Sequence, residues 1–484
     1  MLLEALEKLD REASVLLQNN RTITAGQLAS QVRALAGALA KRNVAEGDRV
    51  ALLLPNCKEL VLALAACARL GAIAAPLDPA WTPPELARAL APLAPRCIFA
   101  LGRHGRALEA ATAAAELAPP LVVRIDRDLE GALPTDDGSV FIEALLEENL
   151  PCPERPPERA ALIAHATWRG RGRPHFAVRS AEAVLEGAVL AARATGLVAA
   201  AERRGPILAA APFYRPGALE LQLVAPLVLG VPVVVLKQLR ARMALKLATT
   251  YGTSVAVAPP ALLALMGRLV ASGAEPPPET VRLFVAASAP PPLPEQTEIV
   301  ERTFQAPLVW GYSPAEAPWA LCVPEERRSL PPTARGLGVP VSETEIDLGD
   351  GGALFVRSRR AAHEFLGESP EDRPTLLGVP TGDRAVRASD GTLFLIPRED
   401  VTTVAAYEVD LTEVAEALRR HPSVALASAF GVPDEEMGTH VRAVVTLAPG
   451  AEESVASLVD FLRERLAYYK IPHSFRFRRL DRPT

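Results

Sequence analysis

Short apolar runs alternate with amphipathic segments along most of this 484-residue chain. Over residues 24–39 apolar side chains recur at helical spacing behind Thr24 and Gln27, which have the spacing of a capping box. The run RVALLLP, ending at Pro55, is typical of a buried strand, and the next unit repeats this order with a helix over residues 60–70 and a strand in GAIAAPL. Such alternation predicts a doubly wound, mostly parallel sheet covered by helices.

The pattern changes toward the C-terminus. RASDGTLFLIPRED predicts a hairpin that turns at Asp390, and the tail then gives a helix (LTEVAEALRR), two strands (VALASAF and HVRAVVTL) and a helix (SVASLVDFLRERL). The chain is also too long for one typical core. We therefore expect an α/β protein with a large N-terminal domain over residues 1–397 and a small α+β C-terminal domain over residues 398–484, with the boundary between Arg398 and Asp400.

Charge and cysteine content exclude several classes of protein. A formal net charge of −5 with mixed signs gives no basic face for nucleic acid. The five cysteines show no CxxC pair and no metal-ligand spacing, which favours free thiols in a reducing cytoplasm and predicts no metal site. The most apolar stretch, LVLALAACARLGAIAAPL, is interrupted by Arg69 and Gly71, so it predicts a buried helix and strand and no membrane span. The charged N-terminus lacks the features of a signal peptide, and we expect a cytoplasmic protein.

Several segments, taken in order, resemble the adenylate-forming superfamily of acyl- and aryl-CoA synthetases, luciferases and peptide-synthetase adenylation domains. The resemblance covers nearly the whole chain and is carried by RVALLLPNCKELVLALAACARLGAIAAPLDP, WGYSPAE, PTGDRA with DGTLFLIPRED, AYEVDLTEVAEALRR and LAYYKIP. It implies a large N-terminal region and a small C-terminal lid that are hinged near Arg398 and Asp400. It also implies an acyl pocket and a pantetheine tunnel between the two domains.

The phosphate loop of that superfamily is altered here. The family pattern T-S-G-T-T-G-x-P-K-G aligns with TWRGRGRPHF over residues 167–176, which keeps the first threonine, the second glycine and the proline. Arg169, Arg171 and Arg173 lie in this loop, and His175 stands where the family has lysine. Three interpretations of the arginines remain open: a rebuilt nucleotide site, a solvated edge, or attraction of CoA phosphates or an acidic carrier protein.

The magnesium-binding motif of the family is altered in this sequence, whereas the ribose-binding motif is retained. The family signature Y-G-x-T-E, whose glutamate holds the magnesium of ATP, aligns with Trp310, Gly311, Tyr312, Ser313 and Pro314. Proline thus replaces the carboxylate, and Glu316 could take its place only after a local rearrangement. Asp383 matches the ribose-binding aspartate and Arg398 matches the hinge; packing is the alternative role for both.

The C-terminal motifs are changed as well. In VTTVAAYEV, Thr403 and Ala406 replace the lysine and the glycine of the family pattern I-K-x-x-G-Y, whose loop admits pantetheine. The family's catalytic lysine should follow shortly after FRFRRLDRPT, and because the sequence ends at Thr484 we expect that lysine to be missing. Removing a positioned cation from such a site costs roughly 10²-fold in rate. These losses together predict that ATP and magnesium are not used.

Three functions remain open. The preferred hypothesis is ATP-independent transfer of an acyl group, such as an anthraniloyl-like aryl group, from acyl-CoA to the phosphopantetheine thiol of an acyl carrier protein. In this the chain resembles the few superfamily members that have lost adenylation and act as acyltransferases. The alternatives are an AMP-forming acyl- or aryl-CoA ligase with a rearranged ATP site, and a non-catalytic homologue that acts as a scaffold.

Candidate residues for the transfer follow from these positions. His175 could act as a general base on the incoming thiol. Cys322 could accept the acyl group if His165 or His175 lies near it. A loop histidine and a buried structural thiol are the alternatives. The positions of the family's acyl pocket and signature are occupied by Tyr214, Arg215, Trp310, Gly311, Tyr312 and Ser313.

Overall fold

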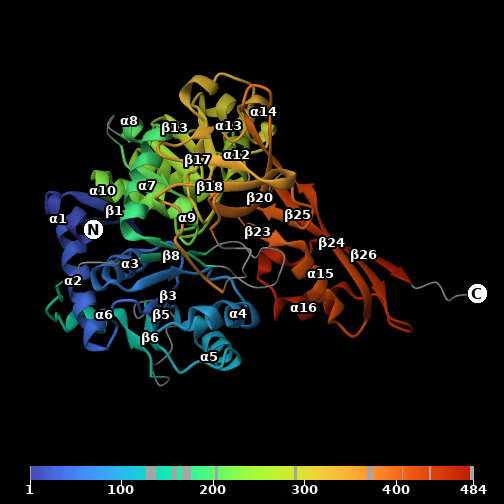
Figure 1. The fold of residues 1–484 in the computed structure, drawn as a ribbon, viewed down its shortest axis with the longest axis horizontal. Coiled ribbons are helices and arrows are strands. Elements are labelled where there is room, and N and C mark those ends of the chain that lie inside the picture. The colour runs from blue at the N-terminus through green and yellow to red at the C-terminus, as the bar shows by residue number, and fades with distance from the viewer. Residues whose placement is uncertain are drawn as a thin grey trace, which may run out of the picture.

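The computed structural model of this protein describes residues 2–126, 138–154, 161–165, 176–201, 205–287, 291–367, 374–405, 407–434 and 438–479. It consists of a large N-terminal α/β body and a small C-terminal α+β domain, which confirms the predicted fold class (Figure 1). The small domain lies at one side of the body, with its helices turned toward the body and its sheet farther away.

The first sheet of the body is parallel in its centre and antiparallel at both edges. In spatial order it contains β16 (Val339–Pro340), β15 (Leu321–Cys322), β14 (Leu308–Tyr312), β13 (Leu283–Ala286), β12 (Val255–Ala258), β10 (Ile207–Ala209), β11 (Val233–Val235), β1 (Ser14–Gln18) and β2 (Arg21–Thr24). Strands β14 through β1 pair in parallel. The loops that follow β10, β12, β13 and β14 therefore meet at one edge, where open α/β sheets place their ligands.

The second sheet of the body repeats this plan. Its order is β19 (Glu364–Leu366), β9 (Phe176–Ser180), β8 (Ala161–His165), β4 (Ile73–Pro76), β3 (Arg49–Leu53), β5 (Cys97–Ala100), β6 (Leu121–Arg124) and β7 (Val140–Phe141). Strands β8 through β7 are parallel, and β9 and β19 are antiparallel. The predicted alternation of strand and helix is confirmed in both sheets.

Capping residues start two body helices where the sequence places them. Thr24 and Gln27 form a capping box at α2 (Ala25–Lys41), and Thr82 and Glu85 form another at α4 (Pro83–Leu93), which has proline at its first position. The other body helices are α1 (Leu2–Lys8), α3 (Lys58–Leu70), α5 (Gly105–Ala114), α6 (Ile142–Glu147), α7 (Ala181–Ala194), α8 (Leu197–Ala201), α9 (Pro216–Leu219), α10 (Ala225–Leu229), α11 (Ala241–Tyr251), α12 (Pro260–Ala271), α13 (Pro294–Phe304) and α14 (Pro332–Arg335). Within the described residues, no helix combines the length and the apolar character needed to cross a membrane.

Antiparallel strands make up the rest of the chain. A third sheet contains β17 (Glu345–Leu348), β18 (Ala353–Arg357), β20 (Val379–Arg387) and β21 (Leu393–Ile396). Its last two strands form the predicted hairpin, and Asp390 accepts the Thr392 N–H in the turn at 2.9 Å. The C-terminal part contains β22 (Val401–Val404), β23 (Tyr407–Asp410), α15 (Leu411–Arg419), β24 (Val424–Asp434), β25 (Gly438–Leu447), α16 (Val455–Arg463) and β26 (Ser474–Arg479). Sequence reasoning missed β26, which pairs in parallel with β25, and the β22–β23 hairpin.

The core of the small domain is continuous with that of the body. One cluster of buried apolar side chains includes Leu86 and Leu90 from α4 together with Val414 and Leu418 from α15. These side chains are excluded from water by one another, so separating the two parts would expose apolar surface. The small domain is therefore packed against the body in this structure and not merely tethered to it.

One cluster of buried charged side chains in the body contains Arg179, Glu220 and Arg360. Arg179 on β9 forms an ion pair with Glu220, which begins the π-helix η2 (Glu220–Val224), and Glu220 is fully excluded from solvent. Arg360 is also buried and donates to the Ser342 carbonyl and the Thr344 hydroxyl. Burial raises the pKa of Glu220 to about 7, although Arg179 and Arg360 act in the opposite direction. The cluster thus places one carboxyl group beside two guanidinium groups at buried positions.

Candidate functional site

The segment that carries Tyr214 and Arg215 follows β10, at the edge where open α/β sheets place their ligands. Buried Asn56 holds this segment in place: its Nδ2 donates to the Ala211 carbonyl at 2.8 Å, and its Oδ1 accepts the Phe213 N–H at 2.8 Å. A buried amide left unpaired costs about 1–3 kcal/mol. Asn56 therefore fixes the backbone immediately before the two predicted acyl-pocket residues.

The strand that carries WGYS and the aspartate of TGD meet beside this segment. The Tyr312 hydroxyl donates to Asp383 Oδ2 at 2.8 Å, so WGYS and TGD lie together. Ser313 Oγ accepts the Trp319 N–H at 3.1 Å, and Trp319 Nε1 donates to the Gly217 carbonyl at 2.8 Å. The structure thus brings three of the motifs that were identified in the sequence to one place.

Trp310 and Gly311 make packing contacts in this arrangement. The Trp310 side chain is 1% exposed, its Nε1 donates to the Gly336 carbonyl at 2.9 Å, and the Arg335 guanidinium lies 5.4 Å from its ring centroid. Gly311 pairs with Cys322 on β15, and a Cβ there would collide with the neighbouring strand. Both residues support the strand that presents Tyr312 and Ser313.

Arg398 binds its neighbour Asp400 through two hydrogen bonds, of 3.1 and 2.7 Å. Burial would lower the pKa of Arg398, but the bond to Asp400 and the nearby carboxylates of Glu408 and Asp383 raise it. The predicted hinge arginine therefore lies within the electrostatic field of the predicted ribose-binding aspartate.

The β22–β23 hairpin reaches the acyl-pocket segment. Arg215 Nη1 lies 3.4 Å from Glu408 Oε2, and burial raises the pKa of Glu408 while Arg215 opposes that shift. Tyr407 stacks on Tyr469 at a centroid distance of 4.1 Å, and the Tyr468 hydroxyl lies 3.2 Å from that of Tyr407. A charged pair and an aromatic cluster thus close this side of the site.

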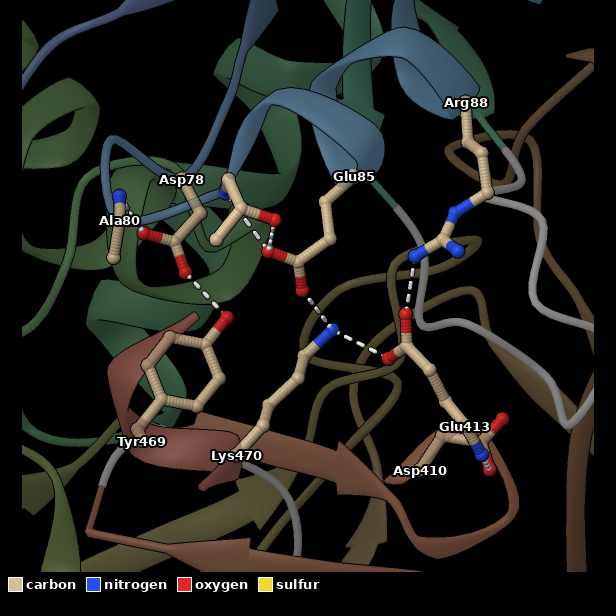
Figure 2. A network of polar contacts seen from close by, with 9 residues as sticks. Asp78, Ala80, Glu85, Arg88, Asp410, Glu413, Tyr469 and Lys470 are labelled. Carbon is tan, nitrogen blue, oxygen red and sulfur yellow. Dashed lines mark hydrogen bonds and ion pairs between the residues drawn. The ribbon is translucent and has the colours of Figure 1, made fainter. Parts of the chain in front are cut away.

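A second polar network joins the body to the C-terminal domain (Figure 2). Tyr469 donates to Asp78 Oδ2 at 2.7 Å, and Lys470 Nζ lies 2.6 Å from both Glu85 Oε1 and Glu413 Oε2. Sequence reasoning missed this network, because Glu85 and Lys470 are 385 positions apart and no local pattern connects them. The LAYYKIP segment, which carried part of the family resemblance, was the one available signal.

Part of the predicted site lies outside the described residues. This applies to Arg169, Arg171, Arg173 and His175 and to the His165 side chain; the His165 backbone ends β8 and pairs with Phe176.

The resemblance implies a magnesium ligand at the end of the signature WGYSP, and two residues there are relevant to it. Pro314 offers no ligand, and Glu316, the alternative carboxylate, is 2% exposed in the core. Within the described residues, no group of three or more His, Cys, Asp or Glu side chains is arranged to hold a metal. The position that corresponds to the family's magnesium-binding glutamate therefore carries no carboxylate in this chain.

Cys322 occupies a buried position on β15. Its thiol is 2% exposed, and burial raises its pKa from 9.0 to about 12. That shift lowers the thiolate fraction at neutral pH roughly a thousandfold. The environment is that of a structural thiol, and the role of acyl acceptor that we considered for Cys322 gains no support from it.

We expect a soluble thiol reagent to modify Cys152 of the folded protein first and Cys322 at least roughly 10²-fold more slowly, because Cys152 is partly exposed and Cys322 is buried with little thiolate. Mass spectrometry of digested samples taken over time would give both rates, and denatured protein serves as the control in which all five cysteines react. Equal labelling rates in the folded protein would contradict a structural role and favour the acyl-accepting one.

The chain is similar in sequence or in structure to known ligases and synthetases. The chain is 26% identical over 493 residues to the fatty acid–acyl-carrier-protein ligase ScoC of Streptomyces coeruleorubidus, a match that covers 95% of this chain and 89% of that protein. The structure is similar to the amide bond synthetase McbA of Marinactinospora thermotolerans, with a TM-score of 0.82, 22% identity and coverage of 100% and 96% of the two chains. It is similar also to o-succinylbenzoate CoA synthetase of Bacillus subtilis, with a TM-score of 0.81, 21% identity and coverage of 99% and 95%.

Family profiles match both parts of the chain. Residues 413–482 match the AMP-binding enzyme C-terminal domain, a range that includes most of α15 and all of β24, β25, α16 and β26. Residues 4–357 match the AMP-binding enzyme family itself, a match that spans the whole first sheet and the segments around Tyr214 and Tyr312. The chain therefore belongs to the AMP-binding enzyme family.

Proposed function

We propose that this protein transfers an acyl group from an acyl-CoA to the phosphopantetheine thiol of an acyl carrier protein without consuming ATP. The chain is an acyl- or aryl-CoA ligase-like member of its family, and its similarity to a fatty acid–acyl-carrier-protein ligase supports a carrier protein as the acceptor. The aromatic residues Tyr214 and Tyr407 beside Arg215 suit an aryl donor such as an anthraniloyl-like thioester.

The strongest support comes from how the charged groups of the expected nucleotide site are engaged. Asp383 accepts the Tyr312 hydroxyl, Arg398 binds Asp400, and Arg215 binds Glu408. Adenylation needs cations on the phosphates of ATP and a carboxylate on magnesium. A site whose arginines neutralise its own carboxylates, with proline in place of the magnesium ligand, is better suited to the uncharged thioester group of an acyl-CoA than to the triphosphate of ATP.

The proposed reaction is an exchange between two thioesters. The carrier thiol loses its proton and attacks the carbonyl carbon of the acyl-CoA, so that a new C–S bond forms. The C–S bond to CoA then breaks, and the leaving thiolate takes up a proton. Because one thioester is exchanged for another, the free energy change is small and no activation by ATP is needed. His175 is our candidate for the base that accepts the first proton.

The test is to incubate the purified protein with a phosphopantetheine-bearing acyl carrier protein and anthraniloyl-, benzoyl- or fatty acyl-CoA, in the absence of ATP. We expect the mass of the carrier to increase by that of the acyl group, with release of free CoA, as measured by intact-protein mass spectrometry. A carrier that lacks phosphopantetheine is the control and should remain unmodified. Loading that requires the free acid, ATP and magnesium, with release of AMP, would overturn the proposal.

The ligase is the second candidate, and one observation favours it. The match to the fatty acid–acyl-carrier-protein ligase covers 95% of the chain, which includes both the body and the C-terminal domain. A ligase would consume ATP in proportion to the acyl-carrier product. The same experiment, run with the free acid and ATP in place of acyl-CoA, therefore decides between the two functions.

A further inference from the structure

We infer that Glu85 and Lys470 are positioning residues that latch the C-terminal domain onto the body and thereby hold the β22–β23 hairpin at the acyl site. The effect on transfer rests on the proposed function, whereas the effect on the position of the domain does not. Figure 2 shows Lys470 between Glu85, which projects from α4 of the body, and Glu413, which projects from α15 of the C-terminal domain.

Glu85 uses its two carboxylate oxygens for two different tasks. Oε2 accepts the Thr82 N–H and the Thr82 hydroxyl, both at 2.8 Å, and so completes the capping box of α4. Oε1 accepts Lys470 Nζ at 2.6 Å. The capping bonds fix the carboxylate before the C-terminal domain arrives, so little side-chain entropy is lost when Lys470 binds. Helix capping needs only Oε2, so Oε1 is available to bind Lys470 of the C-terminal domain.

Lys470 is nearly isolated from water. Its side chain is 1% exposed, and those of Glu85 and Glu413 are 0% and 5% exposed. Burial would lower the pKa of Lys470, but the two carboxylates raise it, so the side chain stays cationic. The bond from Lys470 to Glu413 lies within the C-terminal domain, and the bond to Glu85 crosses to the body. Movement of the domain would therefore break the bond to Glu85 and could leave the bond to Glu413 intact.

Two further contacts flank this bond on the same short stretch of the body. Arg88, one turn after Glu85 on α4, forms an ion pair with the other oxygen of Glu413. Asp78 accepts the Tyr469 hydroxyl at 2.7 Å and the Ala80 N–H at 2.9 Å. Residues 78–88 thus present two carboxylates and one guanidinium to complementary groups of the C-terminal domain. This complementarity specifies a single docked orientation.

The latch is connected to the acyl site through neighbouring residues. Lys470 ends the 3₁₀ turn η6 (Tyr468–Lys470), and Tyr469 of the same turn stacks on Tyr407 at a centroid distance of 4.1 Å. Glu408, the next residue of the hairpin, binds Arg215 of the acyl-pocket segment. Release of Lys470 would therefore shift the turn and the hairpin that closes the site.

The variant Glu85→Gln isolates the crossing bond. Glutamine at this position still accepts the capping hydrogen bonds of α4, and the pair of Lys470 with Glu413 is left in place. The matched control is Glu295→Gln, which makes the same change in the first turn of another body helix, α13, at an exposed position. Arg88→Met is a second variant that removes a neighbouring contact at a partly exposed position, in case Glu85→Gln fails to fold.

The position of the domain can be measured by double electron–electron resonance between spin labels on S428C and T250C, at exposed sites of β24 and α11, in a C152S background. We expect one dominant distance in the parent protein and in Glu295→Gln. Glu85→Gln should increase the population of a second distance roughly tenfold, and Arg88→Met should increase it less. A distance distribution in Glu85→Gln and Arg88→Met that is identical to the parent's would overturn the latch.

The transfer assay provides the second readout. We expect Glu85→Gln to lower kcat about tenfold and leave the KM for acyl-CoA unchanged, because the hairpin and not the acyl pocket is displaced. If the distances change but the parent protein shows no transfer, then the latch stands and the proposed function fails. If the parent protein transfers the acyl group and Glu85→Gln changes neither distance nor kcat, the latch fails and the proposed function stands.

Discussion

Replacing Glu220 with alanine should lower the free energy of unfolding by about 3–5 kcal/mol. Glu220 is fully buried beside Arg179 and Arg360, and its removal leaves the buried Arg179 guanidinium without its carboxylate partner and takes away one of the carboxylates that act on Arg360. A buried charge that loses its partner pays the desolvation penalty without the compensating attraction. Chemical denaturation of the parent protein and the variant at pH 7, with the slopes compared to confirm two-state behaviour, measures the loss.

Two controls separate charge from volume. In Arg179→Met with Glu220→Met the pair is replaced by apolar side chains of similar size, and this double variant should lose far less stability than Glu220→Ala. Glu220→Gln keeps the volume and removes the titration. A loss below about 1 kcal/mol in Glu220→Ala would show that water or another cation reaches the cluster, contrary to the buried position of these side chains.

The same residue predicts a pH dependence whose sign can be derived. The pKa of Glu220 is raised from 4.5 to about 7, so the folded protein binds a proton more tightly than the unfolded chain does. The unfolding free energy that comes from this group should be largest below about pH 4.5 and should fall as the pH rises toward 7. Stability curves of Glu220→Gln should lack this decrease, and an unchanged slope in that variant would assign the titration to another group.

Local sequence patterns were sufficient to predict most of the fold. The capping box at Thr24 and the turn at Asp390 depend on residues within a few positions of one another, and the structure confirms both. Strand β26 was missed although its sequence, SFRFRR, alternates apolar and charged residues, because the run is only six residues long. Its pairing with β25 is set by tertiary packing.

The candidate site was harder to predict, because its contacts also depend on tertiary packing. The family motifs named Tyr312 and Asp383 separately, and only the structure shows that the two side chains are joined by a hydrogen bond. Sequence position could not show that Trp310 is packed into the core, nor that Glu85 binds Lys470 from the other domain. Contacts between residues hundreds of positions apart leave no local pattern, so only the three-dimensional structure reveals them.

Replacing Arg215 with methionine should lower the rate of acyl transfer by about 10²-fold while the protein remains folded. Arg215 opposes the effect of burial on Glu408, and methionine would leave that carboxylate in the site without its partner. Either the hairpin would move so that the Glu408 carboxylate reaches water, or Glu408 would bind a proton and the hairpin would stay in place. The transfer assay with acyl-CoA and the carrier protein measures the loss, and Arg242→Met, at an exposed surface pair on α11, is the matched control.

The double variant Arg215→Met with Glu408→Gln distinguishes the two roles that Arg215 could have. If the arginine acts by neutralising Glu408, removal of both charges should restore most of the transfer rate, because no uncompensated carboxylate remains. If the guanidinium instead touches the acyl donor, the double variant should stay as slow as Arg215→Met, and Arg215 would then be a catalytic or binding residue. Transfer rates of Arg215→Met equal to those of Arg242→Met would contradict both roles and would move the acyl site away from the hairpin.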